Sequence, residues 1–184
     1  VRVAISGEIG TEFMPELLAF RKSSPEIKLE ILTARDALAM LIQRKADLGL
    51  CLVPYKPEHL RGLRVGVLDQ ALYAARDYAK SLGAKGRIAG DHEWIGWGRD
   101  MAQSAGARWM KSNLPETARI GAEVNSWDAF KEAVLCGLGV GHMWCFVADR
   151  EPGLVRIREP EPDLAMELWL LVREDVPPDA NTNA

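Results

Sequence analysis

The chain of 184 residues carries 23 Lys and Arg against 26 Asp and Glu, which leaves a formal charge of −3 at pH 7. Its composition, 48% hydrophobic and 27% charged, is that of an ordinary globular protein and excludes a disordered, collagen-like or disulfide-dense chain. One domain of this size buries about 70% of the surface of its unfolded chain, and two lobes of about 90 residues are also feasible. Because Lys and Arg are not clustered, the composition argues against a free-standing nucleic-acid-binding protein.

The cysteines and the apolar pattern indicate the compartment. Cys51, Cys136 and Cys145 form no CxxC pair and have apolar neighbours in the sequence, which predicts buried thiols in a reducing environment. No apolar run is long enough to cross a membrane, and the first residues lack the features of a signal peptide. We therefore expect a cytoplasmic protein without a membrane partner.

Strand and helix signals alternate from the first residue. Residues 1–6 are strand-like, 13–20 have helical spacing, 27–33 alternate as a strand, 37–44 are helical and 47–53 form an apolar strand. These signals predict a β-α-β-α-β unit.

A second series follows a turn at residues 54–57. Strand-like residues run from 63 to 73 with a break at Asp69 and Gln70. The next predicted elements are a helix at 76–82, a strand at 94–97, a helix at 102–111, a strand at 119–124, a helix at 127–136 and strands at 138–143, 154–157 and 167–172. The tail from 177 to 184 looks frayed. This part predicts another α/β layer.

The run from Gly137 to Gly141 has the composition of a nucleotide-binding loop. A dinucleotide fingerprint needs its glycines after a strand and before a helix, and here the order is reversed. We interpret Gly137 as a left-handed helix C-cap, and Gly139 and Gly141 as residues that allow tight packing of the next strand.

Histidines and cysteines provide no enzymatic or metal-binding signature. His59, His92 and His142 are too scattered for a metal site, so no metal is predicted. A structural role and a ligand contact both stay open for His142. Cys145 has no base placed beside it by a known motif, which favours an inert thiol over a nucleophile. We predict no cofactor and no enzyme activity.

Small polar residues occupy three junctions between predicted strands and helices: residues 6–11, 33–34 and 125–126. In an open α/β sheet, the carboxyl ends of the strands form the ligand crevice, and helix N-termini there favour an anion. Each residue alone could serve as a helix cap. Three junctions from two halves of the chain nevertheless favour a binding cleft.

Eight short segments, taken in order and spacing, carry a resemblance to a known family. They are VRVAIS (1–6), FMPELL (13–18), PEIKLE (25–30), KADLGL (45–50), GVL to YA (66–74), HEWIG (92–96), AVLCGLGVG (133–141) and EPGLVR (151–156). Over residues 1–172 the chain resembles the effector-binding domain of LysR-type transcriptional regulators.

The resemblance implies a fold. This is an α/β fold of two Rossmann-like lobes of mixed, mainly parallel sheet joined by two crossover strands, as in type 2 periplasmic-binding proteins. Residues 1–68 and 150–184 would form the first lobe and 69–149 the second. Such regulators also carry a winged helix-turn-helix, which this chain lacks, so we expect the chain to be part of a longer protein. Family members usually have Leu-Pro where Met143-Trp144 stands.

The resemblance also implies a function and a site. A small organic molecule, expected to be an anion, would bind in a cleft between the lobes and act as an effector. The expected ligand-binding residues are Ser6, Gly7, Glu8, Thr11, Thr33, Leu52, Trp97, Asn125, Ser126 and His142. Ser6, Thr33 and Asn125 would donate hydrogen bonds and Trp97 would supply an apolar wall.

The expected partners follow from the same resemblance. We expect a homodimer or homotetramer that contacts DNA only through the missing N-terminal segment, and the resemblance allows contact with RNA polymerase. Two alternatives stay open: a stand-alone solute-binding protein, and a small α/β enzyme. The missing signal peptide argues against the first and the missing catalytic motif against the second.

Overall fold

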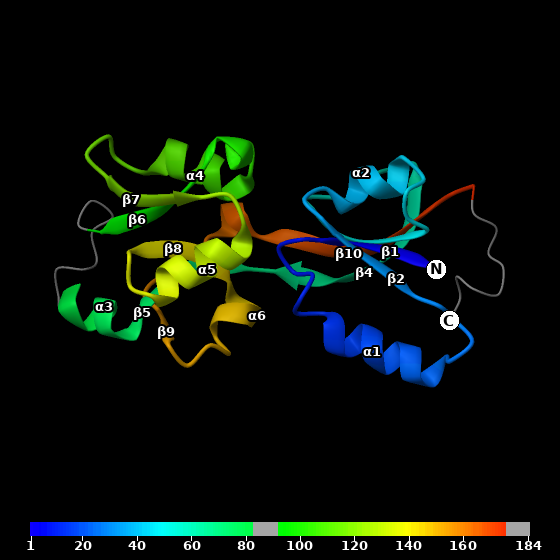
Figure 1. Cartoon of the computed structure of the whole chain (residues 1–184). Coiled ribbons are helices and arrows are strands. Elements are labelled where there is room, and N and C mark those ends of the chain that lie inside the picture. Colours follow the sequence, from blue (N-terminus) through cyan, green and yellow to red (C-terminus); the bar gives the residue numbers. More distant parts are fainter. Residues whose placement is uncertain (83–91, 176–184) are drawn as a thin grey trace. The chain divides into compact units, whose positions relative to one another are not determined.

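The computed structural model describes residues 1–82 and 92–175, and the tail predicted to fray at 177–184 lies outside the described residues. The chain divides into two compact units (Figure 1). The first unit is Val1–Val67 with Met166–Ala184, and the second unit is Leu68–Ala165. The chain therefore passes from one unit to the other twice, which agrees with the two connecting segments expected.

The first unit contains a five-stranded sheet with the order β2-β1-β3-β10-β4. Its elements are β1 (Arg2–Ser6), α1 (Met14–Ser23), β2 (Glu30–Ala34), α2 (Ala37–Ile42), β3 (Leu48–Val53), β4 (Leu60–Leu68) and β10 (Met166–Arg173). Strand β1 pairs in parallel with β2 and β3, and β10 pairs antiparallel with β3. Helices α1 and α2 lie on opposite sides of this sheet (Figure 1). Leu41 of α2 packs with Ala4, Cys51 and Leu171 in the core.

The second unit contains a five-stranded sheet with the order β7-β6-β8-β5-β9. Its elements are β5 (Gln70–Ala75), α3 (Arg76–Leu82), β6 (Glu93–Trp97), the 3-10 turn η3 (Arg99–Met101), α4 (Ala105–Asn113), β7 (Arg119–Val124), α5 (Trp127–Leu135), β8 (Val140–Trp144), α6 (Cys145–Ala148), β9 (Leu154–Arg156) and the 3-10 turn η4 (Pro162–Leu164). Strands β7, β6 and β8 are parallel, whereas β5 runs antiparallel to β8 and β9.

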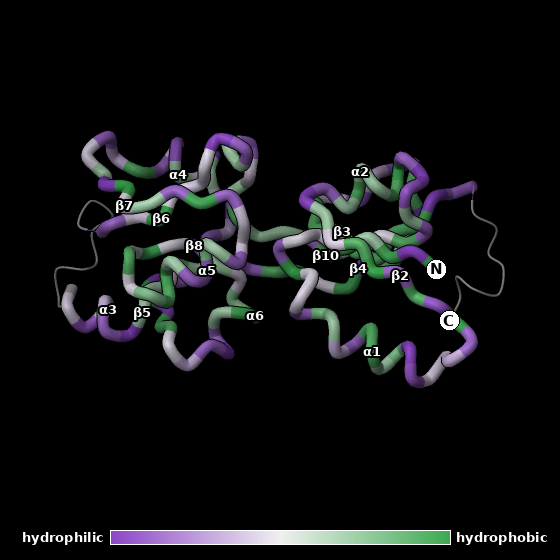
Figure 2. The backbone as a smooth tube through the Cα atoms, in the orientation of Figure 1, coloured by the Kyte–Doolittle hydropathy of each residue, from purple (hydrophilic) through white to green (hydrophobic). Residues whose placement is uncertain are grey.

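The two faces of the second sheet have separate apolar clusters. Phe130 and Val134 of α5 pack with Ile95 and Met143 on one face. On the other face, Trp94 packs with Leu72 and Val140 and with side chains of α3 and α4. Figure 2 shows the hydrophobic residues concentrated in the strands and the hydrophilic ones toward the loops.

The structure confirms most predicted elements but moves one boundary. We expected residues 150–184 in the first lobe, and the structure places 150–165 in the second unit. The reason is the three-residue strand β9, whose Leu154 and Val155 pair with Ala75 and Ala74 of β5. Such a short antiparallel strand is held by a distant partner and has no local signal that assigns it to a lobe.

The interpretation of the glycine run is confirmed. Gly137 has φ +77° at the end of α5, a conformation in which glycine avoids the steric cost of a side chain. A side chain at Gly139 would collide with the backbone carbonyl of Glu93, and one at Gly141 would collide with the Phe130 ring. These two glycines let β8 approach β6 and α5 closely.

The cysteine expectation holds for one residue of three. Cys51 is buried, and burial, with a smaller contribution from Asp36, raises the pKa of its thiol to about 12. Cys145 is only partly buried and Cys136 is exposed, so the prediction of buried thiols was wrong for Cys136.

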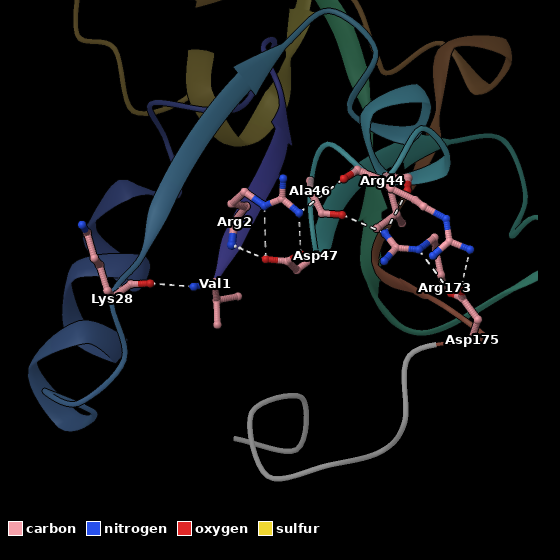
Figure 3. A network of polar contacts seen from close by, with 9 residues as sticks. Val1, Arg2, Lys28, Arg44, Ala46, Asp47, Arg173 and Asp175 are labelled. Carbon is pink, nitrogen blue, oxygen red and sulfur yellow. Dashed lines mark hydrogen bonds and ion pairs between the residues drawn. The ribbon is translucent and has the colours of Figure 1, made fainter.

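A polar network fastens the end of the first sheet at which β1 and β3 begin (Figure 3). The Arg2 guanidinium lies 2.9 Å from the Asp47 carboxylate, which also accepts a bond from the Arg2 backbone N–H at 2.8 Å. The hydrogen bond from the Arg2 guanidinium lowers the pKa of Asp47. Arg173 of β10 donates to the carbonyls of Leu41 and Ala46, at 3.1 and 2.9 Å. These contacts join α2, β3 and β10 and leave the opposite end of the sheet for the candidate site.

Candidate functional site

In the first unit, three parallel strands bring predicted site residues to one edge of the sheet. Ile5 pairs with Thr33 and Ser6 with Ala34 in the β1–β2 register. The backbone N–H of Leu52 on β3 donates to Ser6 Oγ at 3.2 Å. Ser6 is 8% exposed, whereas Thr33 is exposed. The carboxyl ends of β1, β2 and β3 therefore meet at Ser6, as the sequence analysis expected of this half of the site.

The loop after β1 closes over the end of β2. The Gly7 N–H donates to the Ala34 carbonyl at 2.8 Å, which continues the ladder by one residue. A Cβ at Gly10 would lie 2.6 Å from Thr33 Cγ2, so the loop approaches β2 as closely as a glycine allows. Glu8 is partly buried and Thr11 is exposed. The loop that contains Gly7, Glu8 and Thr11 thus packs on the end of β2, on the same edge as Ser6.

In the second unit, Trp97, Asn125 and Ser126 also gather at the carboxyl ends of parallel strands. Trp97 pairs with Val124, and the Gly98 N–H donates to the Val124 carbonyl at 2.8 Å. Asn125 and Ser126 follow immediately and are exposed. Ser126 Oγ accepts the Ala129 N–H at 3.2 Å and is the N-cap of α5. Its hydroxyl oxygen is thus already engaged in capping.

Trp97 lies within an aromatic cluster. Its ring stacks on Phe130 with centroids 4.3 Å apart and lies 4.9 Å from the ring of Trp127. Its edge faces Gly106 of α4, where it forms part of a pocket of about 340 Å³ that Met110, Leu114 and Ile120 also line. Of the predicted site residues, only Trp97 is among those that line this pocket.

His142 lies apart from this set. It alternates along β8 with Met143, so its side chain is on the Val140 face of the sheet, away from Phe130. Its ring contacts Trp109 edge-on, with ring centroids 4.3 Å apart, and its Nε2 lies 4.0 Å from the Glu161 carboxylate. Burial lowers the pKa of His142 to about 4, with a smaller effect from Arg158, so the imidazole is neutral at pH 7.

Two residues that the sequence analysis did not select belong to the same edge as Trp97. The indole rings of Trp127 and Trp144 lie 5.8 Å apart. Their Nε1 atoms are buried, and neither has a hydrogen-bond partner in the part of the chain that the structure describes. The sequence carried a signal for them, because Trp97 ends one predicted strand, Trp144 directly follows another, and Trp127 begins the helix after the third.

Cys145, the candidate nucleophile of the enzyme alternative, lies beside a saturated polar network. Tyr73 Oη donates to Asp149 Oδ1 at 2.6 Å and accepts from Arg156 Nε at 3.1 Å. Arg156 also pairs with Asp149. Burial raises the pKa of Tyr73, and the Asp149 bond adds to this. The network ties β5, β9 and the end of α6 together, which is a structural role.

Two further features bear on the class of protein. No group of three or more His, Cys, Asp or Glu side chains is placed to hold a metal ion within residues 1–82 and 92–175. In the same residues, no helix has the length and apolar character needed to cross a membrane.

Two α/β units, each with parallel strands whose carboxyl ends carry the candidate residues, define a type 2 periplasmic-binding-protein-like module. The family model described as the LysR substrate binding domain matches residues 1–184. The chain therefore belongs to this family, the effector-binding regulatory domains of LysR-type transcriptional regulators.

Solved structures support the same fold. The CcmR regulatory domain of Synechocystis, solved in complex with 2-PG, has a TM-score of 0.75 and 18% identity, and the match covers 100% of this chain and 91% of that one. The AmpR effector domain of Pseudomonas aeruginosa has a TM-score of 0.74 and 16% identity, with 100% and 90% covered. The CrgA regulatory domain of Neisseria meningitidis has a TM-score of 0.72 and 19% identity, with 95% and 89% covered. Comparison with curated proteins gave no match.

The family confirms the resemblance, the fold class and the regulatory function expected from the sequence. LysR-type regulators bind small-molecule effectors and act as oligomers on DNA, and their effector-binding domains are not an enzyme family.

Proposed function

We propose that the effector of this domain is a small organic anion held at the carboxyl ends of the parallel strands. The observation that carries the proposal is the convergence of β1, β2 and β3 on Ser6, whose hydroxyl bridges to β3 through Leu52. Thr33 and the 7–11 loop lie at the same edge. Trp97, Asn125 and Ser126 form the contribution of the second unit, while the face that His142 occupies makes it the weakest member of the set.

An anion suits the strand ends of either unit for two reasons. Helices α1 and α5 begin within a few residues of Thr11 and Ser126, and helix N-termini carry a partial positive charge. Ser6 and Thr33 carry uncharged hydroxyls that can donate without introducing a buried charge. In addition, the E204G mutant of the OxyR2 regulatory domain of Vibrio vulnificus, which shares this fold, binds sulfate in its solved structure.

In the proposed mechanism, the effector shifts the balance between arrangements of the units or of the oligomer. Only a ligand with different affinities for those arrangements can do this. The response would pass to DNA through an N-terminal winged helix-turn-helix in a homodimer or homotetramer, with RNA polymerase as a further partner. In this proposal the domain binds its effector without transforming it.

The test is a thermal-shift screen of the chain with acetate, succinate, 2-oxoglutarate, benzoate and sulfate. A ligand at about 100 times its Kd stabilises the folded state by about 2.7 kcal/mol, so at least one carboxylate is expected to raise Tm by several degrees. Ser6→Ala and Thr33→Val should reduce the ligand-induced rise, whatever they do to the Tm of the free chain. Ser112→Ala, which removes an exposed hydroxyl from α4, is the matched control and should keep the rise. If no carboxylate changes Tm, the proposal fails.

A further inference from the structure

All three parallel strands of the second unit lead to a tryptophan at their carboxyl ends. Strand β6 ends at Trp97 and β8 ends at Trp144. Strand β7 ends at Val124, and α5 begins three residues later at Trp127. Since the carboxyl ends of neighbouring parallel strands meet at one edge of a sheet, the three indoles form a single group there.

The rings contact one another in sequence. The ring centroids of Trp97 and Trp127 lie 4.9 Å apart. Those of Trp127 and Trp144 lie 5.8 Å apart, with an interplanar angle of 32°. Trp144 is 2% exposed and Trp97 is 9% exposed. Phe130 supports the group from α5, where it stacks on Trp97. The indoles are therefore held in place by packing before any ligand arrives.

Two of these indoles carry a donor that the packing leaves unused. The Nε1 atoms of Trp127 and Trp144 are buried and lack a hydrogen-bond partner among the described residues. An indole N–H can only donate, so it requires an acceptor to offset the cost of leaving water. Trp169 of the first unit shows the usual solution, because its indole donates to Glu167 Oε2 at 2.8 Å. Apolar packing alone gives no reason for two unpaired donors at one edge of the sheet.

We propose that Trp127 and Trp144 donate indole hydrogen bonds to oxygen atoms of the effector, and that the effector is an aromatic or otherwise planar unsaturated carboxylate. This inference rests on the proposed function and specifies its ligand class. A carboxylate supplies two acceptor oxygens, and hydrogen bonds to a charged acceptor are the stronger kind. The rings of Trp97, Trp127 and Phe130 already pack on one another, and a planar unsaturated ligand would extend this group, because aromatic pairs gain energy beyond the area that they bury.

The direct test uses the whole chain with ¹⁵N-labelled tryptophan. The sequence has six tryptophans, and each indole N–H gives its own NMR signal. Benzoate should shift the Trp127 and Trp144 signals downfield, because an acceptor arrives, and leave the Trp169 signal in place. Cyclohexanecarboxylate tests the planar ring at the same charge, and benzamide tests the charge with the same ring. Both are expected to produce smaller shifts at equal concentration.

Substitutions provide the affinity test. Trp144→Phe removes the donor while keeping an aromatic ring, and it should raise the Kd for benzoate about tenfold, the loss expected for one hydrogen bond to a charged oxygen. Trp169→Phe is the control, because the Trp169 indole already donates to Glu167 in the first unit, and it should leave the Kd unchanged. Should Trp144→Phe fail to fold, the titration of the unmodified chain decides.

The outcomes separate this inference from the proposed function. If succinate or 2-oxoglutarate stabilises the chain while benzoate does not, or if benzoate binds without moving either indole signal, the inference is overturned and the proposed function stands. If no acid in either panel binds, both are overturned. Selective shifts of the two signals with benzoate support both.

Discussion

The carboxyl ends of the parallel strands differ in chemistry between the two units, although both units place helices after strands in the same way. In the first unit the edge consists of a hydroxyl, backbone N–H groups and exposed small residues around Ser6 and Thr33. In the second unit it consists of packed indoles. The same topology thus supplies a polar surface in one case and an aromatic surface in the other.

The difference arises from what packs beneath each edge. Gly10 of the first unit lies directly on Thr33, so the loop and the strand leave little room for large side chains. In the second unit, the Trp97 ring packs against Gly106 of α4 and the Phe130 ring against Gly141 of β8, where a side chain on either glycine would collide with the ring. Glycine position therefore determines where the large rings can be accommodated.

The largest expected effect is on the free energy of unfolding, which a substitution at the aromatic edge should lower much more than one at the polar edge. Trp97→Ala removes a ring that stacks on Phe130 and should lower the free energy of unfolding by about 3–5 kcal/mol. Thr33 is an exposed residue at the edge of the first sheet, so Thr33→Ser should change the free energy of unfolding by less than about 0.5 kcal/mol. Urea unfolding followed by circular dichroism measures both. Equal losses would show that the two edges do not differ in packing.

The next prediction compares how acid weakens the two units. Burial holds the folded-state pKa of His142 at about 4, below its ordinary value of about 6.5, so between these values the unfolded chain binds the additional proton. The His142 contribution is fully present above about pH 6.5 and is lost as pH falls toward 4, by at most about 1.4 kcal/mol per pH unit. Asp47, whose pKa Arg2 lowers, contributes stability that is lost only at lower pH.

Two measurements check this order. An NMR titration of the His142 ring should give a midpoint near pH 4, and His142→Phe should flatten the stability of the chain between pH 4 and 6.5. His59→Asn, at an exposed position, is the matched control and should keep the wild-type pH dependence. A His142 midpoint near 6.5 would contradict the buried environment formed by Trp109 and Glu161.

The sequence predicted the elements of both units well because their signals are local. The side chains of residues 140–143 point alternately to the two faces of one strand. Gly137 stands where a helix must end. The placement of 150–165 was missed because β9 is held only by its distant partner β5.

The candidate site was predictable only in part. Ser6, Thr33 and Asn125 follow from the rule that ligand groups stand at strand ends. The two unpaired indoles do not, because whether a donor finds an acceptor depends on neighbours from other elements. The face of His142 follows from its alternation with Met143, because successive side chains of a strand point to opposite faces.

The smallest expected effect separates capping from ligand binding within the second unit. Ser126 caps α5 and Ser104 caps α4, each by accepting a backbone N–H at 3.2 Å. Since the two bonds match, Ser126→Ala and Ser104→Ala should each cost about 1 kcal/mol in the free chain, measured by thermal unfolding. Ser126 is among the residues proposed to contact the effector and Ser104 is not, so Ser126→Ala should reduce the Tm rise that a bound carboxylate produces more than Ser104→Ala does. If the two variants keep the same ligand-induced rise, Ser126 is a cap and nothing more, and the contribution of the second unit to the effector narrows to Asn125 and the indoles.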